Sequence, residues 1–331
     1  MNILIAGLGS IGRRHLTNLR RIEPGANLTI WHQRSRSQGP PELPGLVARH
    51  VYSVEEALES RPDVAVITSP ASVHIPTALA MAREGVHLFI EKPLSHTLEG
   101  INDLLVLCRR QNLVLMVGYN LRFYEPLQLI KKALDDGRIG RVLTMRAEVG
   151  QFLPDWRPGT DYRATGSARN ELGGGVVLEL SHELDYARWL MGEVTSVMAR
   201  VARLSNLEID TEDTAEIILQ FSNGALGSIH LDMIQQPATR TCRISGTEGT
   251  ITWDWESHRV YLFEARNRTG QDLGPVRDID RNEMYVAELR HFLDCIKGNA
   301  TPLIDGNDGR RVLEIALAVK RSSEEQRAIE I

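Results

Sequence analysis

The order of hydrophobic and polar residues changes character about 120 residues into the chain. The first third holds short apolar runs without alternation, which are typical of parallel strands buried on both faces. These runs occupy residues 1–6, 28–31, 64–67, 86–90 and 113–117. A helical pattern follows several of them, and one such helix is predicted over residues 98–110. The first third is therefore expected to fold as a doubly wound parallel sheet.

From about residue 141 the apolar residues alternate with polar ones, as in strands with one buried face. Ser222-Asn223-Gly224 separates two such runs, and residues 246–249 separate two more, so two hairpins are predicted. The chain is thus expected to be α/β. Residues 1–120 are expected to form a Rossmann domain, and residues 121–331 are expected to form an α+β domain with a mostly antiparallel sheet.

Three helical patterns interrupt or follow the second set of strands. One covers residues 176–190, a second runs from Tyr285 to Ile296 and ends at Gly298, and the last carries Val312 to Val319. The last two come after all the predicted strands, and such C-terminal helices can pack back on the first domain.

The glycine motif at residues 7–12, GLGSIG, lies where the first strand would turn into a helix. Gly7 permits a tight turn, Gly9 lets a pyrophosphate approach the backbone, and Gly12 lets the helix pack against the strand. The expected cofactor contacts here are Gly7, Gly9, Ser10, Ile11 and Gly12. A glycine-rich turn without a ligand is the alternative.

The end of the second strand carries no acidic residue. An NAD site normally places Asp or Glu about 20 residues after the last glycine, to bind the ribose 2′-hydroxyl. Here that position is His32, and Arg34, Ser35, Arg36 and Ser37 follow. Guanidinium and hydroxyl groups suit a 2′-phosphate, so NADP is predicted to be preferred over NAD. Alternatively, the arginines only solvate an exposed loop, and both cofactors bind.

Two further strand ends carry polar residues. Ligands of open parallel sheets bind beyond the carboxyl ends of the strands. Thr68-Ser69-Pro70 ends one strand and Glu91-Lys92-Pro93 the next, so topology places Lys92 beside the cofactor. Glu91 either orients Lys92 or accepts backbone donors. The cofactor contacts expected beyond the glycine motif are His32, Arg34, Ser35, Thr68, Ser69, Pro70, Glu91 and Lys92.

Composition and charge limit the classes of partner and the cellular compartment that fit this chain. The chain has 331 residues and a formal net charge of −5, with acids and bases intermixed, which argues against nucleic acid or an anionic membrane. Cys108, Cys242 and Cys295 are far apart and lack metal-ligand spacing, which fits a reducing cytoplasm. The chain has neither an apolar stretch of 18 residues nor a basic segment before the first run, so neither a membrane span nor a signal peptide is predicted.

Residues 151–175 form an unusually long connection, rich in Gly, Pro, Arg and aromatic residues. Planar guanidinium groups suit phosphates, and aromatic faces suit sugar rings, so this connection is a candidate substrate loop. An ordered interface loop is the alternative. The substrate contacts expected from this chemistry are Arg122, Tyr124, Trp156, Arg157 and Tyr162.

These motifs together resemble the glucose–fructose oxidoreductase / inositol dehydrogenase (Gfo/Idh/MocA) family. The matching segments are residues 7–15, Thr68-Ser69-Pro70 with His74, Glu91-Lys92-Pro93, residues 118–123 with Pro126, and His182 with Asp185. The resemblance implies a Rossmann domain, a second α+β domain whose open sheet often joins subunits, and nicotinamide-dependent redox chemistry on a sugar, cyclitol or sugar nucleotide. It also implies that His74 contacts the cofactor and that the substrate is contacted by Lys92, Asn120, Glu179 and His182. A homodimer or homotetramer is expected.

One departure from the family concerns the acid before His182. The family has it four residues before the histidine, whereas Glu179 stands three before. At that spacing both side chains would share a helix face and line the cleft. Glu179, His182, Glu183 and Asp185 could also be interpreted as a metal site, but no second His/Cys cluster complements them, so no metal is expected.

Oxidation of a carbinol removes a proton from the hydroxyl as hydride leaves the carbon, so a positioned base is needed. Lys92 and His182 are the predicted catalytic residues. Two alternatives stay open: a redox-assisted glycosidase that retains its NAD, and a non-catalytic cofactor sensor. Net turnover of free cofactor would identify a dehydrogenase.

Overall fold

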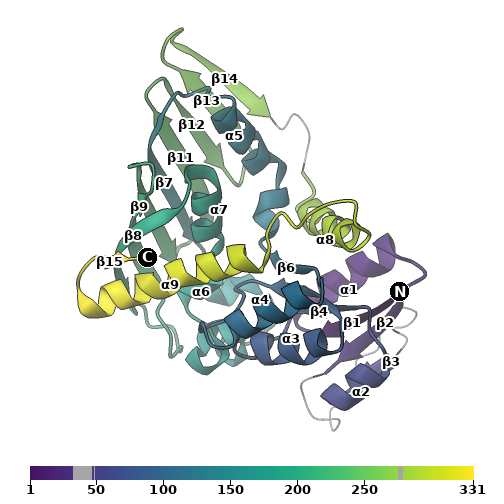
Figure 1. Cartoon of the computed structure of the whole chain (residues 1–331). Coiled ribbons are helices and arrows are strands. Elements are labelled where there is room, and N and C mark those ends of the chain that lie inside the picture. The colour runs from purple at the N-terminus through teal and green to yellow at the C-terminus, as the bar shows by residue number, and fades with distance from the viewer. Residues whose placement is uncertain (33–46, 48, 275–278) are drawn as a thin grey trace. The chain divides into compact units, whose positions relative to one another are not determined.

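The computed structural model of the chain describes residues 1–32, 47, 49–274 and 279–331. The chain forms two compact units (Figure 1). The first comprises Met1–Tyr119 and Tyr285–Leu313, and the second comprises Asn120–Met284 and Glu314–Ile331. A segment from the C-terminal third thus belongs to the first unit.

The first unit contains a six-stranded parallel sheet in the order β3-β2-β1-β4-β5-β6. Its strands are β1 (Asn2–Ala6), β2 (Asn27–Trp31), β3 (Arg49–Val51), β4 (Val64–Ile67), β5 (His87–Glu91) and β6 (Leu115–Gly118). The central strands β1 and β4 are apolar except for Asn2 and almost fully buried, as parallel strands covered on both faces should be. The strand order reverses between β1 and β4, where ligands of such sheets bind. The predicted doubly wound sheet is confirmed.

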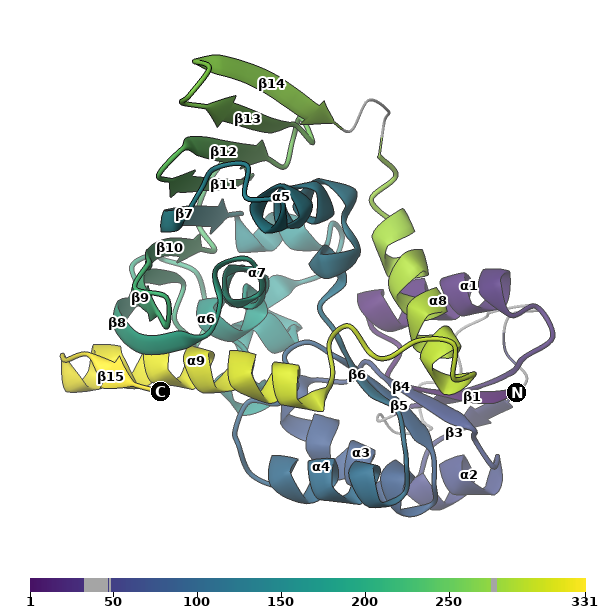
Figure 2. The ribbon, with the colours of Figure 1, turned by 45° about the horizontal axis from the view of Figure 1, so that its top comes forward.

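Helices cover both faces of this sheet (Figure 2). α1 (Ser10–Ile22) and α8 (Glu283–Ile296) lie on one face, and Arg14 stacks on Tyr285 there, 4.4 Å from the ring centre. The other face carries α2 (Val54–Glu59), α3 (His74–Arg83) and α4 (Ile101–Arg110). α4 was predicted from residue 98. It begins three residues later because Gly100 adopts a left-handed φ of 72°, and Leu98 remains 42% exposed.

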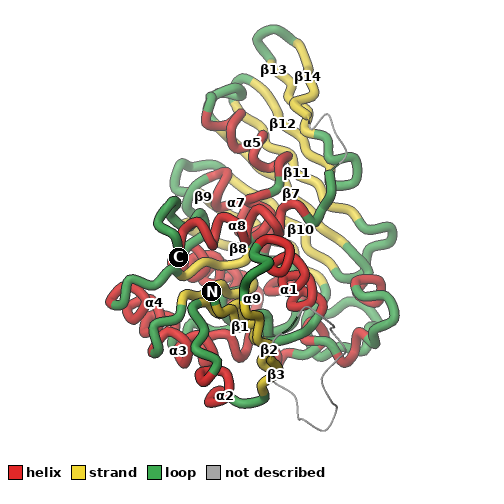
Figure 3. The backbone as a smooth tube through the Cα atoms, turned by 90° about the vertical axis from the view of Figure 1, so that its right-hand side faces the viewer, coloured by secondary structure: helices red, strands yellow, loops and turns green. Residues whose placement is uncertain are grey.

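The second unit contains a nine-stranded sheet in the order β14-β13-β12-β11-β7-β10-β9-β8-β15. Its strands are β7 (Val142–Gly150), β8 (Val194–Ala202), β9 (Thr214–Phe221), β10 (Leu226–Asp232), β11 (Thr239–Gly246), β12 (Gly249–Asp254), β13 (Val260–Glu264), β14 (Thr269–Gly274) and β15 (Ile329–Glu330). Only β7 and β10 pair in parallel, so the predicted mostly antiparallel sheet is confirmed, as are both hairpins (Figure 3).

Helices of the second unit pack on one face of its sheet. α5 (Glu125–Asp135) contacts β13 and β14, α6 (Val176–Glu179) contacts β9 and β10, and α7 (His182–Met191) contacts β7. Odd-numbered residues of β9 from Ala215 to Leu219 are buried, whereas even-numbered ones are exposed. Met198, Ile218 and Leu226 each expose at least half of their surface, so the other face presents apolar side chains to solvent.

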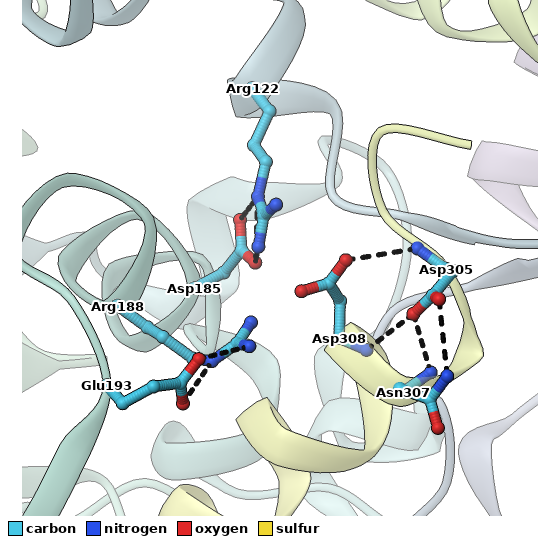
Figure 4. Close-up of polar contacts among 7 residues, drawn as sticks. All are labelled: Arg122, Asp185, Arg188, Glu193, Asp305, Asn307 and Asp308. Atoms are coloured by element: carbon cyan, nitrogen blue, oxygen red, sulfur yellow. Dashed lines mark hydrogen bonds and ion pairs between the residues drawn. The ribbon is translucent and has the colours of Figure 1, made fainter. Parts of the chain in front are cut away.

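α9 (Gly306–Glu325) begins with a reciprocal cap (Figure 4). Asp305 accepts the N–H groups of Asn307 and Asp308 at 2.8 and 2.9 Å, and the Asp308 carboxylate accepts the Asp305 N–H at 3.2 Å. Near its other end, Ser322 accepts the N–H of Ala199 in β8 at 2.9 Å. The two ends of this helix are thus fixed by polar contacts, each within one unit.

We expect His230 on β10 to stabilise the fold below neutral pH. Its ring bonds Asp232 at 2.9 Å and Glu216 at 2.7 Å, and these carboxylates raise its pKa from 6.5 to about 9. A raised histidine pKa gives stability that is complete below the unfolded value and is lost as pH rises through about 9. His230→Gln should therefore lower the free energy of unfolding more at pH 6 than at pH 9.5. Urea titrations at both values measure this, and an equal loss at both would contradict it.

Candidate functional site

The glycine turn after β1 is packed on its inner side and open on its outer side. Gly7 has φ 107°, and a Cβ there would lie 2.8 Å from the backbone nitrogen of Ser69. A Cβ on Gly12 would lie 2.4 Å from the Gly7 carbonyl oxygen. Around Gly9, by contrast, a Cβ would meet no described atom within 4 Å. Two glycines are required by packing, and the third borders space that a ligand can enter.

The N-terminus of α1 suits an anion. Gly9 caps this helix without a side-chain hydrogen bond, and the first turn, with Ser10 and Ile11, carries no acidic residue. Backbone N–H groups and the helix dipole at such an end bind phosphate. With the open surface at Gly9, this end fits the pyrophosphate of a dinucleotide.

The end of β4 is tied to the glycine turn and to the segment after β5. The Thr68 hydroxyl donates to the Gly7 carbonyl at 2.8 Å. The His74 ring bonds the carbonyls of Ser69 and Pro93 at 2.7 and 3.0 Å, and it is only 1% exposed. Burial lowers the pKa of His74. Thr68 and His74 thus shape the strand ends from inside, whereas Pro70 is exposed.

The end of β2 holds a stack of rings in place of an acid. The His32 and His50 nitrogens are 2.8 Å apart, and the ring of His32 stacks on those of His50 and Tyr52 at 5.1 Å. Burial, followed by the charges of His50 and Arg13, lowers the pKa of His32. The predicted phosphate ligands of the next segment, residues 34 and 35, lie outside the described residues.

Glu91, at the end of β5, is held on both of its oxygens. One accepts a hydrogen bond from Nε2 of His15 on α1 at 2.6 Å, and the other accepts the Lys92 N–H at 3.1 Å. His15 is fully buried, and Lys92 is half-buried. Of the two roles left open for Glu91, backbone acceptance is therefore observed. The His15 contact was not predicted, because 76 residues separate the partners and no spacing rule connects them.

In the second unit, the helix predicted over residues 176–190 is broken. α6 ends at Glu179, Leu180 leaves the helical region with ψ 28°, and α7 begins at His182. The prediction that Glu179 and His182 share one helix face is therefore wrong. Both side chains are half-buried, but they belong to different helices. His182 gains a defined place as the first residue of α7.

Two buried ion pairs hold the first turn of α7. The Arg122 guanidinium binds the Asp185 carboxylate at 2.7 and 3.0 Å, with side-chain exposures of 4% and 0% (Figure 4). Arg240 binds Glu183, which is fully buried, at 2.8 Å. Arg122 was expected to contact substrate, but its charge is used within the protein. The pairs fix the start of the helix that carries His182.

Two other expected substrate contacts are buried. Tyr124 is 1% exposed, and its hydroxyl lies 2.5 Å from Nδ1 of His258. Burial raises the pKa of Tyr124 to about 12. Asn120 is 3% exposed. Tyr124 therefore packs in the interior of the second unit.

The long connection, residues 151–175, contains four short 3₁₀ turns, and its three expected substrate residues are half-buried. Trp156 donates its indole N–H to the Gln151 carbonyl at 2.9 Å. Arg157 contacts the Ser167 hydroxyl at 3.4 Å, and the Tyr162 hydroxyl accepts the Glu208 N–H at 3.2 Å. The loop is thus ordered by its own polar contacts and still exposes part of each side chain.

Neither a metal cluster nor a membrane span is found in the part of the chain that the structure describes. No three His, Cys, Asp or Glu residues there gather as metal ligands, and Glu183 and Asp185 instead pair with arginines. No described helix has the length and apolar content needed to cross a bilayer. The described cysteines, Cys108, Cys242 and Cys295, are all buried free thiols.

Family models match both parts of the chain. Residues 1–119 match the model described as an oxidoreductase family with an NAD-binding Rossmann fold. Residues 127–252 match the GFO/IDH/MocA C-terminal domain. The two matches together span most of the chain.

Similar proteins cover the chain almost completely. A myo-inositol 2-dehydrogenase of Thermotoga maritima is 29% identical over 100% of this chain and 98% of its own. A 1,5-anhydro-D-fructose reductase of Ensifer adhaerens is 28% identical over 99% and 97%. The WlbA dehydrogenase of Bordetella pertussis, solved with NADH and UDP-GlcNAcA, superposes with a TM-score of 0.82 at 25% identity, covering 99% and 98%. A levoglucosan dehydrogenase with NADH shares the fold, with a TM-score of 0.88 at 21% identity and coverage of 100% and 99%.

Proposed function

Because the chain belongs to the Gfo/Idh/MocA family of oxidoreductases with an NAD-binding Rossmann fold, we propose that it transfers a hydride between a nicotinamide cofactor and a CH–OH carbon of a sugar, cyclitol or sugar nucleotide. The observation that carries this proposal is that two features lie at the same edge of the parallel sheet. The open glycine turn at Gly9 follows β1, and Lys92 follows β5, which ends at Glu91. The names of the relatives support the substrate class.

Each catalytic role follows from the proton that accompanies the hydride. A bound nicotinamide supplies the hydride acceptor or donor. Lys92 takes the proton from the substrate hydroxyl during oxidation and returns it during reduction. His182 shares that proton or holds the same hydroxyl, and the ion pairs of Asp185 and Glu183 keep its helix in place. Trp156, Arg157 and Tyr162 bind the remaining substrate groups through their exposed parts.

The proposal is tested by mixing the purified protein with sugars, cyclitols and sugar nucleotides and following the absorbance of reduced nicotinamide. Net oxidation or reduction of free cofactor with at least one of these classes is expected. Cleavage of a glycoside without net cofactor turnover would instead identify a redox-assisted glycosidase. Cofactor binding without any reaction would identify a sensor.

We also propose that NADP is preferred over NAD. The support is the end of β2, where His32 replaces the usual acid and Arg13 lies close enough for its charge to act on His32. A dianionic 2′-phosphate is attracted by the Arg13 cation, and no carboxylate repels it at the position of His32. Relatives solved with NADH show that the family accepts the unphosphorylated form, so the preference depends on this chain's own residues.

Arg34→Ala should separate the two cofactors. Losing one charge-assisted hydrogen bond lowers kcat/KM for NADP by about ten- to more than a hundred-fold, roughly 1.5–3 kcal/mol, and leaves NAD nearly unchanged. Arg36→Ala is the matched control, and a smaller effect is expected because it lies farther from the strand end. A wild type that favours NAD, or an equal loss for both cofactors, would contradict the preference.

We propose that a second copy of the chain covers the open face of the nine-stranded sheet. That face exposes Met198 and Ile218. Arg200 and Glu216 lie opposite each other on β8 and β9 and are both exposed, so a copy related by a two-fold axis can place opposite charges together. Ile218→Arg should convert the assembly to monomers, measured by sedimentation velocity. A wild type that sediments as a monomer would overturn this proposal.

A further inference from the structure

His15 joins the phosphate-binding helix to the residue beside Lys92. It lies in the second turn of α1, and its side chain is completely buried. Its Nε2 lies 2.6 Å from one oxygen of Glu91, whose other oxygen accepts the backbone N–H of Lys92 at 3.1 Å. One carboxylate therefore connects α1 to Lys92, and all three residues belong to the first unit.

Packing fixes this carboxylate in place. Gly118 pairs with Glu91 across β5 and β6, and a Cβ on Gly118 would lie 3.1 Å from the carboxyl carbon of Glu91. The ring of His15 is itself held edge-on by Phe89 and Tyr285, at centroid distances of 5.2 and 6.2 Å. Neither partner can leave the contact without disturbing its neighbours.

The hydrogen bonds define the charge of the pair. Nδ1 of His15 is buried and has no hydrogen-bond partner among the described residues. A proton on Nδ1 would have no hydrogen-bond acceptor. The contacts therefore fit a neutral ring that carries its proton on Nε2 and donates it to an ionised Glu91. The pair of His15 and Glu91 thus carries one negative charge, and Lys92 is the next residue in the chain.

We propose that His15 is a positioning residue for Lys92, acting through Glu91: it keeps that carboxylate ionised and aimed at the Lys92 backbone. A fixed anion next to Lys92 favours the protonated, ammonium form of its side chain. The hydrogen bond from the Lys92 N–H fixes the backbone from which that side chain extends. The catalytic consequence rests on the proposed function of Lys92. The electrostatic consequence does not, and it can be measured without turnover.

Two substitutions of His15 test the effect of its N–H donor to Glu91. His15→Leu fills the space without a donor, and buried Glu91 then favours its neutral, protonated form. His15→Gln restores an N–H donor. His87→Leu is the control, because His87 lies at the opposite end of β5, where it accepts the Val114 N–H at 3.0 Å.

The direct measurement is an NMR pH titration of Lys92 in protein labelled with ¹³C-lysine. The chain has five lysines, Lys92, Lys131, Lys132, Lys297 and Lys320, so each signal can be assigned by substitution. In His15→Leu, the Lys92 signal should titrate about 0.5–1 pH unit lower than in the wild type, because a neighbouring negative charge is lost. His15→Gln and His87→Leu should titrate like the wild type.

The kinetic measurement is the pH profile of kcat with saturating cofactor. His15→Leu should lower kcat by about 10–100-fold and move the half-maximal pH downward, with cofactor Kd within about three-fold of the wild type. His15→Gln should recover most of kcat. An unchanged Lys92 titration, or equal losses in both variants, would overturn the positioning role. A shifted titration in a protein that turns over no sugar, cyclitol or sugar nucleotide would overturn the proposed function alone.

Discussion

Lys92→Met is expected to lower kcat by about 10²–10⁴-fold, the range for loss of a general acid or base. Methionine keeps the length and apolar part of the side chain but cannot carry a proton. The half-buried position after β5 stays filled, so the fold should be preserved. Because the expected pyrophosphate site is at Gly9 and the start of α1, cofactor Kd should stay within a few-fold of the wild type.

The measurement is steady-state turnover with the best substrate of the panel, together with cofactor binding followed by fluorescence. Lys132→Met is the matched control, since the Lys132 side chain is 72% exposed and pairs with Asp136 at the surface end of α5. Its kcat should equal that of the wild type. Near-normal turnover in Lys92→Met would show that another group moves the proton.

Features that depend on local sequence could be predicted. Apolar runs predicted five of the six parallel strands of the first unit, all except the short β3, and Ser222-Asn223-Gly224 predicted the β9–β10 hairpin. Burial and turn geometry act over a few residues, so both are visible in local sequence. The roles of Gly7 and Gly12 also follow from their order between strand and helix, and the close contacts of their missing Cβ atoms agree with it.

Features that depend on partners distant in sequence could not be predicted. Arg122 and Tyr124 looked like ligand-binding residues because nothing near them in sequence satisfies a guanidinium or a phenol. Their partners, Asp185 and His258, are 63 and 134 residues away. The break between α6 and α7 was missed for a related reason. Residues 176–190 are helical in pattern, and only the fold shows that Leu180 leaves the helix.

The pair of Arg122 and Asp185 is expected to give the largest loss of stability. Arg122→Met leaves an ionised carboxylate with 0% side-chain exposure and without its guanidinium partner, which costs about 3–5 kcal/mol. The variant should also lower kcat, because Asp185 lies one turn after His182 at the start of α7. Urea unfolding and steady-state kinetics measure the two effects.

The same helix provides the control (Figure 4). Arg188 pairs with Glu193 at 2.6 Å near the end of α7, but Glu193 is 49% exposed, so water solvates the carboxylate when its partner is lost. Arg188→Met should therefore cost only about 0–1 kcal/mol. The double variant Arg122→Met/Asp185→Leu removes both buried charges and should recover much of the stability lost in Arg122→Met. If it recovers stability but not kcat, the pair serves to place His182. If Arg122→Met is as stable as Arg188→Met, the pair contributes little and α7 is held by its apolar contacts.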